Sequence, residues 1–163
     1  MSCKNTLAAY GLREAGHREF GAYKSASHPS DLPGISFVLE DTFRRATNVV
    51  YAFVVGDQVL YVGETTNGMS DRFTSYRYGN KLERDNDNCI KREITNALQQ
   101  NRTVDGAACP VGIVELPKGK LEIPASKPLE AALIGEFRGL LNRKSMAARG
   151  LRPVAIAVVD ASS

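Results

Sequence analysis

The stretch VVYAFVVGDQVLYVGETTNGMSDR, residues 49–72, decides the fold of this chain. Two runs of β-branched and aromatic residues, 49–55 and 59–63, flank the short segment GDQ at 56–58. This composition predicts an antiparallel hairpin with a glycine-containing loop. After the second run the apolar pattern stops, and a polar loop leads into a short helix that carries Arg72. The hairpin and this helix therefore form the centre of the predicted domain.

The length of the hairpin loop decides which side chains share a face of the sheet, because successive side chains of a strand alternate between faces. A three-residue loop pairs Tyr51 with Gly63 and places Tyr61 on the same face as Tyr51. A two-residue loop separates the two tyrosines. In the following helix Arg72 and Tyr76 are four residues apart and share one helical face. In the first register, three phenols and a guanidinium can converge on one patch.

Composition places the chain among ordinary globular proteins. It has 163 residues, of which 43% are hydrophobic and 24% charged, so we expect one domain with a substantial core. No apolar run is long enough to span a bilayer, and the first residues lack a signal-peptide pattern, so we expect a cytoplasmic protein with no membrane partner. The three cysteines have no zinc-site spacing and are expected to be reduced thiols. The formal net charge of +3 permits a polyanionic partner.

The remaining segments predict an α+β fold with a small, mostly antiparallel sheet flanked by helices. Residues 1–45 are expected to be an N-terminal arm of helices and loop that packs on the core, with helices through 7–16 and 35–46. The domain proper spans 46–163. Its sheet is built from the hairpin 49–63 and a strand near 110–116, joined by a helical insertion near 80–102 and followed by a C-terminal strand within 152–160.

Two helices are legible beyond the hairpin. In CIKREITNALQQN, residues 89–101, the residues Ile90 and Ile94 begin a buried stripe, while Lys91 and Arg92 are expected to point outward. The second helix lies in KPLEAALIGEFRGLLNRK, residues 127–144, and its leucines and isoleucine give an apolar stripe. Glu130 lies in its first turn. Taken alone, this carboxylate is more simply interpreted as a complement to the helix dipole.

The ordered set of these residues resembles the GIY-YIG nuclease superfamily. The resemblance rests on VVYAFVV, on LYVG ten residues after the first tyrosine, on Arg72 and Tyr76, and on the late LExxLI and LLN contexts around Glu130 and Asn142. It covers residues 49–143. Two valines replace the glycine and isoleucine of the first motif, and Tyr76 stands where many members have histidine. Asp71 stands where some members have a lysine beside the arginine, which Lys81 or Lys91 could replace.

The resemblance implies a role for each of these residues in phosphodiester hydrolysis. Glu130 binds one Mg²⁺ or Mn²⁺, and Tyr51 or Tyr61 acts as the general base, with Tyr51 favoured. Arg72 holds the scissile phosphate, since a planar guanidinium matches two phosphate oxygens. Tyr76 hydrogen-bonds near the attacking water, and Asn142 braces the site. Each residue also has an ordinary interpretation: strand aromatics, a surface cation and, for Asn142, a helix C-cap.

Basic residues cluster beside both halves of this predicted site and suit contacts to DNA phosphates. The predicted DNA contacts are Arg77, Lys81, Arg84, Arg138, Arg143 and Lys144. The resulting hypothesis is a divalent-metal-dependent DNA endonuclease, sequence-recognising and of the restriction or phage type, with a homodimer as one route to cutting both strands. Two alternatives stay open: a structure-specific or repair-type nuclease, and a catalytically silent nucleic-acid-binding module on the same fold.

Overall fold

The computed structural model describes residues 2–20, 34–78, 86–115, 122–137, 141 and 142, and the statements below concern these residues. Five helices and seven strands follow one another along the described chain. They are α1 (Cys3–Ala9), β1 (Arg13–Phe20), β2 (Ile35–Leu39), α2 (Asp41–Arg44), β3 (Val49–Val55), β4 (Gln58–Thr65), α3 (Met69–Tyr78), α4 (Asn86–Gln99), β5 (Val104–Pro110), β6 (Ile113–Glu115), β7 (Glu122–Pro124) and α5 (Ser126–Glu136). None of these helices is long and apolar enough to cross a bilayer.

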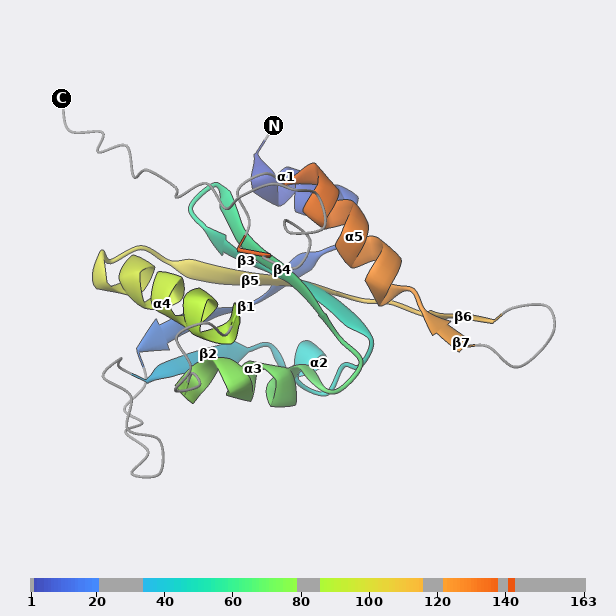
Figure 1. The fold of residues 1–163 in the computed structure, drawn as a ribbon, viewed down its shortest axis with the longest axis horizontal. Coiled ribbons are helices and arrows are strands. Elements are labelled where there is room, and N and C mark those ends of the chain that lie inside the picture. Colours follow the sequence, from blue (N-terminus) through green and yellow to red (C-terminus); the bar gives the residue numbers. More distant parts are fainter. Residues whose placement is uncertain (1, 21–33, 79–85, 116–121, 138–140, 143–163) are drawn as a thin grey trace.

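The five main strands form one antiparallel sheet in the order β2-β1-β5-β3-β4. Helices α1 and α5 lie on one face of this sheet, and α2, α3 and α4 lie on the other (Figure 1). Strands β6 and β7 form a separate ribbon that projects from the body next to the start of α5 (Figure 1). The predicted α+β class with an antiparallel sheet and flanking helices is confirmed.

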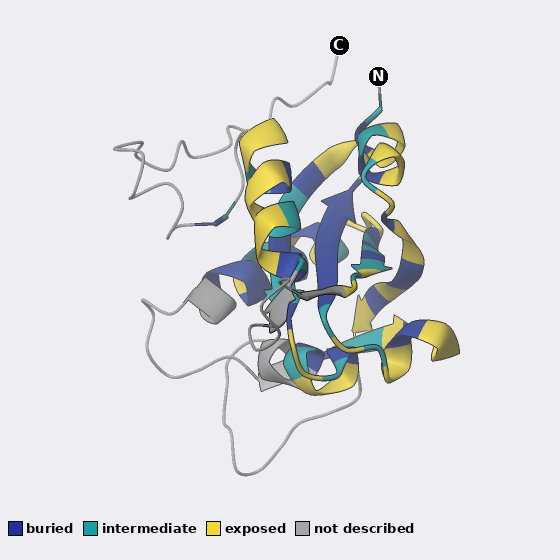
Figure 2. Cartoon of the chain, turned by 90° about the vertical axis from the view of Figure 1, so that its right-hand side faces the viewer, coloured by how far each residue is buried: buried dark blue, intermediate teal, exposed yellow. Residues whose placement is uncertain are grey.

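The central strand β3 is buried on both faces of the sheet. All seven residues of β3 are buried, and the helices on either side turn exposed faces outward (Figure 2). Alternate residues of β3 belong to two clusters: Tyr51, Phe53 and Val55 pack with α2, α3 and α4, while Val50 and Ala52 pack with α1 and α5. Because β3 is covered on both faces, it is apolar throughout instead of alternating with polar residues.

The hairpin register combines features of the two predicted loops. The turn has two residues, since Val55 pairs with Gln58, and Gly56 occupies its first position with a φ of 62°. The register then shifts between Phe53 and Val54, so that Phe53 pairs with Tyr61. The extra residue in this β-bulge is Leu60. The bulge restores the pairing expected for a three-residue loop, and the separation of the tyrosines predicted for a two-residue loop is wrong.

The N-terminal segment differs from the predicted arm of helices and loop. Residues 13–20 and 35–39 are strands β1 and β2, and β1 pairs with β5 inside the sheet. Helix α1 begins at Cys3 and has Ser2 as its N-cap. Asp57 in the hairpin turn also accepts a hydrogen bond from the Cys3 backbone N–H at 2.8 Å. The first 45 residues thus contribute two of the five main strands, of which β1 has a charged sequence without an apolar strand pattern.

Three further boundaries are corrected by the structure. The strand expected near 110–116 is divided, because β5 ends at Pro110 and β6 belongs to the projecting ribbon. The insertion near 80–102 contains α4, but Lys91 is only 1% exposed, so the expectation that it points outward is wrong. It lies beside Ile90, Ile94 and Thr95 on a buried face that is wider than the apolar stripe. The predicted C-terminal strand within 152–160 lies outside the described residues.

Candidate active site

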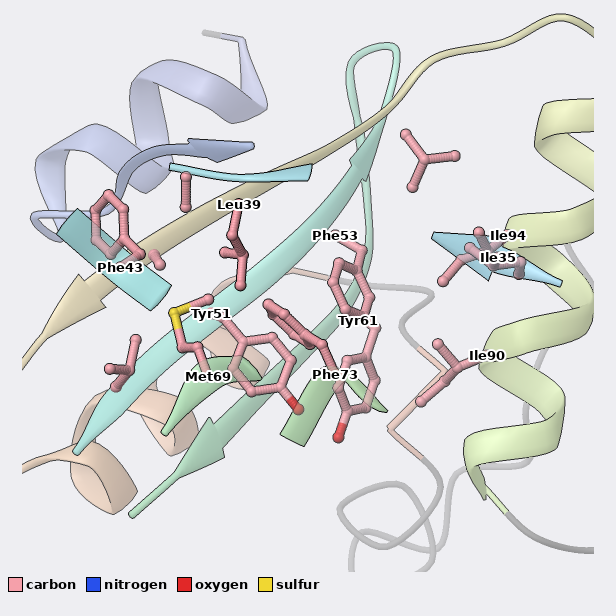
Figure 3. Packing of buried hydrophobic residues seen from close by; sticks show 14 of the residues in the cluster. Ile35, Leu39, Phe43, Tyr51, Phe53, Tyr61, Met69, Phe73, Ile90 and Ile94 are labelled. Atoms are coloured by element: carbon pink, nitrogen blue, oxygen red, sulfur yellow. The ribbon is translucent and has the colours of Figure 1, made fainter. Parts of the chain in front are cut away.

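Tyr51 and Tyr61 lie side by side on the face of the sheet that α3 covers. Their ring centroids are 6.1 Å apart, and both rings contact Phe53. The two hydroxyl oxygens point to the same end of the cluster (Figure 3). Tyr51 is 1% exposed and Tyr61 6%, so both phenol rings are held by packing. The bulge at Leu60 is what brings Tyr61 to this face.

Gly63 provides the space in which the two phenols meet. It pairs with Tyr51 across the hairpin, and a Cβ at this position would lie 2.7 Å from the Tyr51 hydroxyl oxygen and 2.6 Å from Tyr61 Cε1. Both contacts are too short for a Cβ to be present at residue 63 while the two rings keep their positions. The glycine of the YVG sequence is therefore required by the ring positions and not by backbone flexibility.

Helix α3 brings Arg72 to the phenol pair. Phe73 and Met69 anchor this helix in the core, and the Phe73 ring packs edge-on against Tyr51 with centroids 5.0 Å apart. Next to Phe73, the half-buried Arg72 donates a hydrogen bond from Nε to the Tyr51 hydroxyl oxygen at 3.1 Å. The guanidinium and the phenol are thus one connected unit.

A second cation lies beneath this unit. Arg18 on β1 is 2% exposed, and its guanidinium carbon lies 4.4, 4.6 and 5.0 Å from the ring centroids of Phe37, Phe53 and Phe73. Cation–π attraction favours a guanidinium among such rings. Two of these rings also pack against Tyr51, so Arg18 is part of the support of the site.

Helix α5 carries Glu130 to the opposite side of β4. Burial raises the pKa of the Glu130 carboxyl, and the like charge of Glu64 raises it further, while Lys127 and Arg72 lower it. Glu130 is half-buried. Arg72 is thus a weaker influence on this carboxyl than burial and Glu64. A raised pKa means that the ionised carboxylate is less favourable here than in water.

Glu64 was not anticipated from the sequence. It follows Gly63 in β4 and accepts a hydrogen bond at 3.1 Å from the hydroxyl of Ser126, which is fully buried at the first residue of α5. Strand alternation was the available signal, because Gly63 faces the tyrosines and the next side chain must face α5. No sequence pattern linked β4 to residue 126.

Asn142 binds the outer edge of β4. Its Oδ1 accepts the Val62 backbone N–H at 3.2 Å, and its Nδ2 donates to the Val62 carbonyl. The preceding residue, Leu141, donates its backbone N–H to the Leu60 carbonyl at 3.0 Å. Helix α5 ends at Glu136 and Phe137 is extended, so Asn142 does not cap that helix. Its carboxamide takes the place of a neighbouring strand beside the bulge.

The other predicted contacts cannot be placed in the site. Tyr76 and Arg77 lie in α3, but their side chains are outside the described part of the structure. Lys81, Arg84, Arg138, Arg143 and Lys144 lie outside the described residues altogether. The structure therefore brings Tyr51, Tyr61 and Arg72 together on one face of the sheet. Glu64, Ser126 and Glu130 lie on the α5 side of β4, and Asn142 binds the edge of that strand.

Comparison with solved structures agrees with the predicted resemblance at the level of the fold. The chain is similar to the solved structure of a mutant of bacteriophage T4 EndoII, in which a glutamate is replaced by alanine. The TM-score is 0.61, the sequence identity is 19%, and the match covers 84% of this chain and 95% of that one. Restriction endonuclease HPY188I in complex with product DNA aligns with a TM-score of 0.47 and 14% identity, over 94% and 84% of the two chains.

No protein-family model and no curated protein sequence matches the chain. The likeness to bacteriophage T4 EndoII therefore establishes the shared fold, and any activity must be argued from the residues of this chain.

Proposed function

We propose that the chain is a divalent-metal-dependent DNA endonuclease that hydrolyses phosphodiester bonds at a site formed by Tyr51, Tyr61, Arg72 and Glu130. The observation that carries this proposal is the hydrogen bond between Arg72 and Tyr51. The positive charge of Arg72 also lowers the pKa of the Glu130 carboxyl, against the larger effects of burial and Glu64. A phosphate-binding cation, a hydroxyl that can accept a proton and a carboxylate are the groups that this hydrolysis needs.

Tyr51 is proposed as the general base. The N–H of a guanidinium stabilises a phenolate more than a neutral phenol, so the bond from Arg72 favours the deprotonated form of Tyr51. The same guanidinium can bind phosphate oxygens through its planar fork. Tyr61, held beside Tyr51 by the bulge, orients the attacking water. Tyr76 is proposed to hydrogen-bond near that water, and Asn142 to fix β4 from its edge.

The donor chemistry around Glu130 fits Mg²⁺ or Mn²⁺. These hard cations take oxygen ligands and are commonly bound by one or two carboxylates, with water and substrate phosphate completing the shell. Among the described residues there is no group of three or more His, Cys, Asp or Glu side chains that could hold a metal ion, so water and substrate phosphate would have to complete the shell. When bound, the cation supplies Lewis-acid stabilisation of the phosphate and of the leaving oxygen.

DNA is the proposed substrate, and recognition of a base sequence is part of the proposal. The basic residues Arg77, Lys81, Arg84, Arg138, Arg143 and Lys144 are proposed as phosphate contacts, which makes binding steeply salt-dependent. A homodimer, or two successive nicks by one chain, would account for cutting both strands.

The experiment is cleavage of a supercoiled plasmid by the purified chain with Mg²⁺. We expect nicked and linear products with Mg²⁺ and no products in EDTA. The cleavage rate of Glu130→Ala should be lower by a factor of about 100 or more. The matched control is Glu136→Ala, which removes an exposed glutamate from the same helix and should cleave like the unchanged protein.

Sequencing the product ends distinguishes the remaining possibilities. Ends at one recurring sequence support the restriction or phage type, and ends at branches or lesions support the repair type. Salt-sensitive DNA binding without cleavage under any divalent cation would instead identify a catalytically silent module. Full activity of Glu130→Ala would overturn the proposed chemistry.

A further inference from the structure

Glu64 and Ser126 form a bridge between β4 and α5 directly beside Glu130. The Ser126 hydroxyl donates to Glu64 Oε2 at 3.1 Å, and Ser126 is completely buried. Residues four apart on a helix are neighbours on one face, so Ser126 and Glu130 lie one above the other on α5. A side chain that reaches Ser126 from β4 therefore reaches the Glu130 face of the helix.

The hydrogen bond also fixes how Glu64 is oriented. A glutamate at the end of a strand has three rotatable bonds and loses considerable rotamer entropy when one conformation is selected. Here one carboxylate oxygen is occupied by a buried hydroxyl, while Oε1 of the same group remains to accept a second interaction. Two glutamates from separate elements therefore lie on the same side of α5, and the charge of Glu64 raises the pKa of the Glu130 carboxyl.

On the basis of the proposed function, we propose that Glu64 is a second carboxylate ligand of the divalent cation that Glu130 binds, and that Ser126 positions it. Placing two carboxylates together in a half-buried site is unfavourable unless a cation lies between them. A cation bound by two carboxylates retains several coordination positions for water and phosphate, as Mg²⁺ prefers. The role of Glu64 is thus to raise the affinity of the site for the cation before DNA is bound.

The inference is tested by measuring Mn²⁺ binding to the full chain without DNA, by isothermal titration and by water-proton relaxation. Glu64→Gln keeps the size of the side chain and should weaken Mn²⁺ binding about 10- to 100-fold. Relaxation should show additional inner-sphere water on the remaining Mn²⁺. Ser126→Ala leaves both carboxylates but loses their alignment, and should give a smaller loss of affinity in the same direction.

A general effect of charge is separated from direct ligation by Glu136→Gln, which removes one exposed negative charge from α5. Long-range attraction is screened by salt, whereas ligation is not. The deficit of Glu64→Gln relative to Glu136→Gln should therefore persist in high salt. Equal Mn²⁺ affinities of Glu64→Gln and the unchanged protein would overturn the inference.

The failure of this inference can be distinguished from the failure of the proposed function. If Glu130→Gln loses Mn²⁺ binding and cleavage while Glu64→Gln binds Mn²⁺ normally, only the role of Glu64 is wrong. If Glu130→Gln changes neither Mn²⁺ binding nor cleavage, the proposed function itself fails, whatever Glu64 does.

Discussion

Replacing Asn142 with alanine removes the side chain that holds the edge of β4. Two hydrogen bonds to the Val62 backbone are lost, one accepted and one donated by the carboxamide. Asn142 is 7% exposed and Val62 is fully buried, so the Val62 N–H and C=O gain little from water in exchange. The substitution therefore leaves backbone groups without good partners, beside the bulge that places Tyr61.

The size of the effect follows from these two bonds. A hydrogen bond contributes about 0.5–1.5 kcal/mol net, and a buried group left without a partner costs about 1–3 kcal/mol. Val62 lies on an edge strand, where some rehydration is possible, so we expect a loss of about 2–3 kcal/mol in the free energy of unfolding. For a chain of this size, that corresponds to a Tm lower by about 4–12 °C.

Urea unfolding followed by circular dichroism measures this loss directly, with Asn96→Ala as the control. Asn96 is exposed on α4, and its replacement should change stability by less than about 0.5 kcal/mol. Asn142→Asp should also destabilise the protein at neutral pH, because it keeps the acceptor for the Val62 N–H but turns a negative charge toward the Val62 carbonyl. If Asn142→Ala unfolds like the unchanged protein but no longer cleaves DNA, then the side chain acts in the chemistry and our interpretation of it as a structural brace is refuted.

Three further predictions concern the phenols and the buried lysine. In Gly63→Ala the new Cβ displaces the rings of Tyr51 and Tyr61, and plasmid cleavage should slow about a hundredfold. The control Gly68→Ala should cleave normally, because a Cβ at that position lies 3.8 Å from its nearest atom. Equal cleavage rates of the two variants would show that the placement of the rings does not matter. Replacement of Tyr51 by phenylalanine should lower the cleavage rate more than the same change at Tyr61, and the reverse order would reassign the general base. Burial lowers the pKa of Lys91 from its usual 10.5, so between the folded-state pKa and 10.5 the unfolded chain binds more protons than the folded chain. The free energy of unfolding should therefore rise as pH increases through this range. Urea unfolding should show a smaller rise with pH in Lys91→Met, and an equal rise in both proteins would contradict this prediction.

The hairpin could be predicted because its strands lie at the centre of the sheet. A strand covered on both faces has an uninterrupted apolar sequence, and that pattern is visible without knowledge of its neighbours. The pairing expected for a three-residue loop places Tyr51 and Tyr61 on the same face of the sheet, and this is the pairing observed. What could not be read was the bulge at Leu60, because no glycine or other local signal marks it.

Strand β1 shows why the N-terminal segment was mispredicted. Its sequence REAGHREF contains five charged or titratable residues, and its buried cation, Arg18, is accommodated by aromatic rings from three other elements. Those rings lie in other elements, so nothing in the sequence of β1 itself indicates that Arg18 is buried. The same holds for Lys91, whose position on a buried face is set by what α4 packs against, and for Glu64, whose partner Ser126 is 62 residues away.

The bulge at Leu60 also has a consequence for the evolution of this hairpin. A two-residue turn with a bulge and a three-residue loop without one give the same pairing of Tyr51 with Gly63. The turn can therefore gain one residue while the strand loses its bulge, and Tyr51 and Tyr61 still lie on the same face of the sheet. Homologous sequences should tolerate variation of residues 56–60 far better than any change in the number of residues between the two phenols.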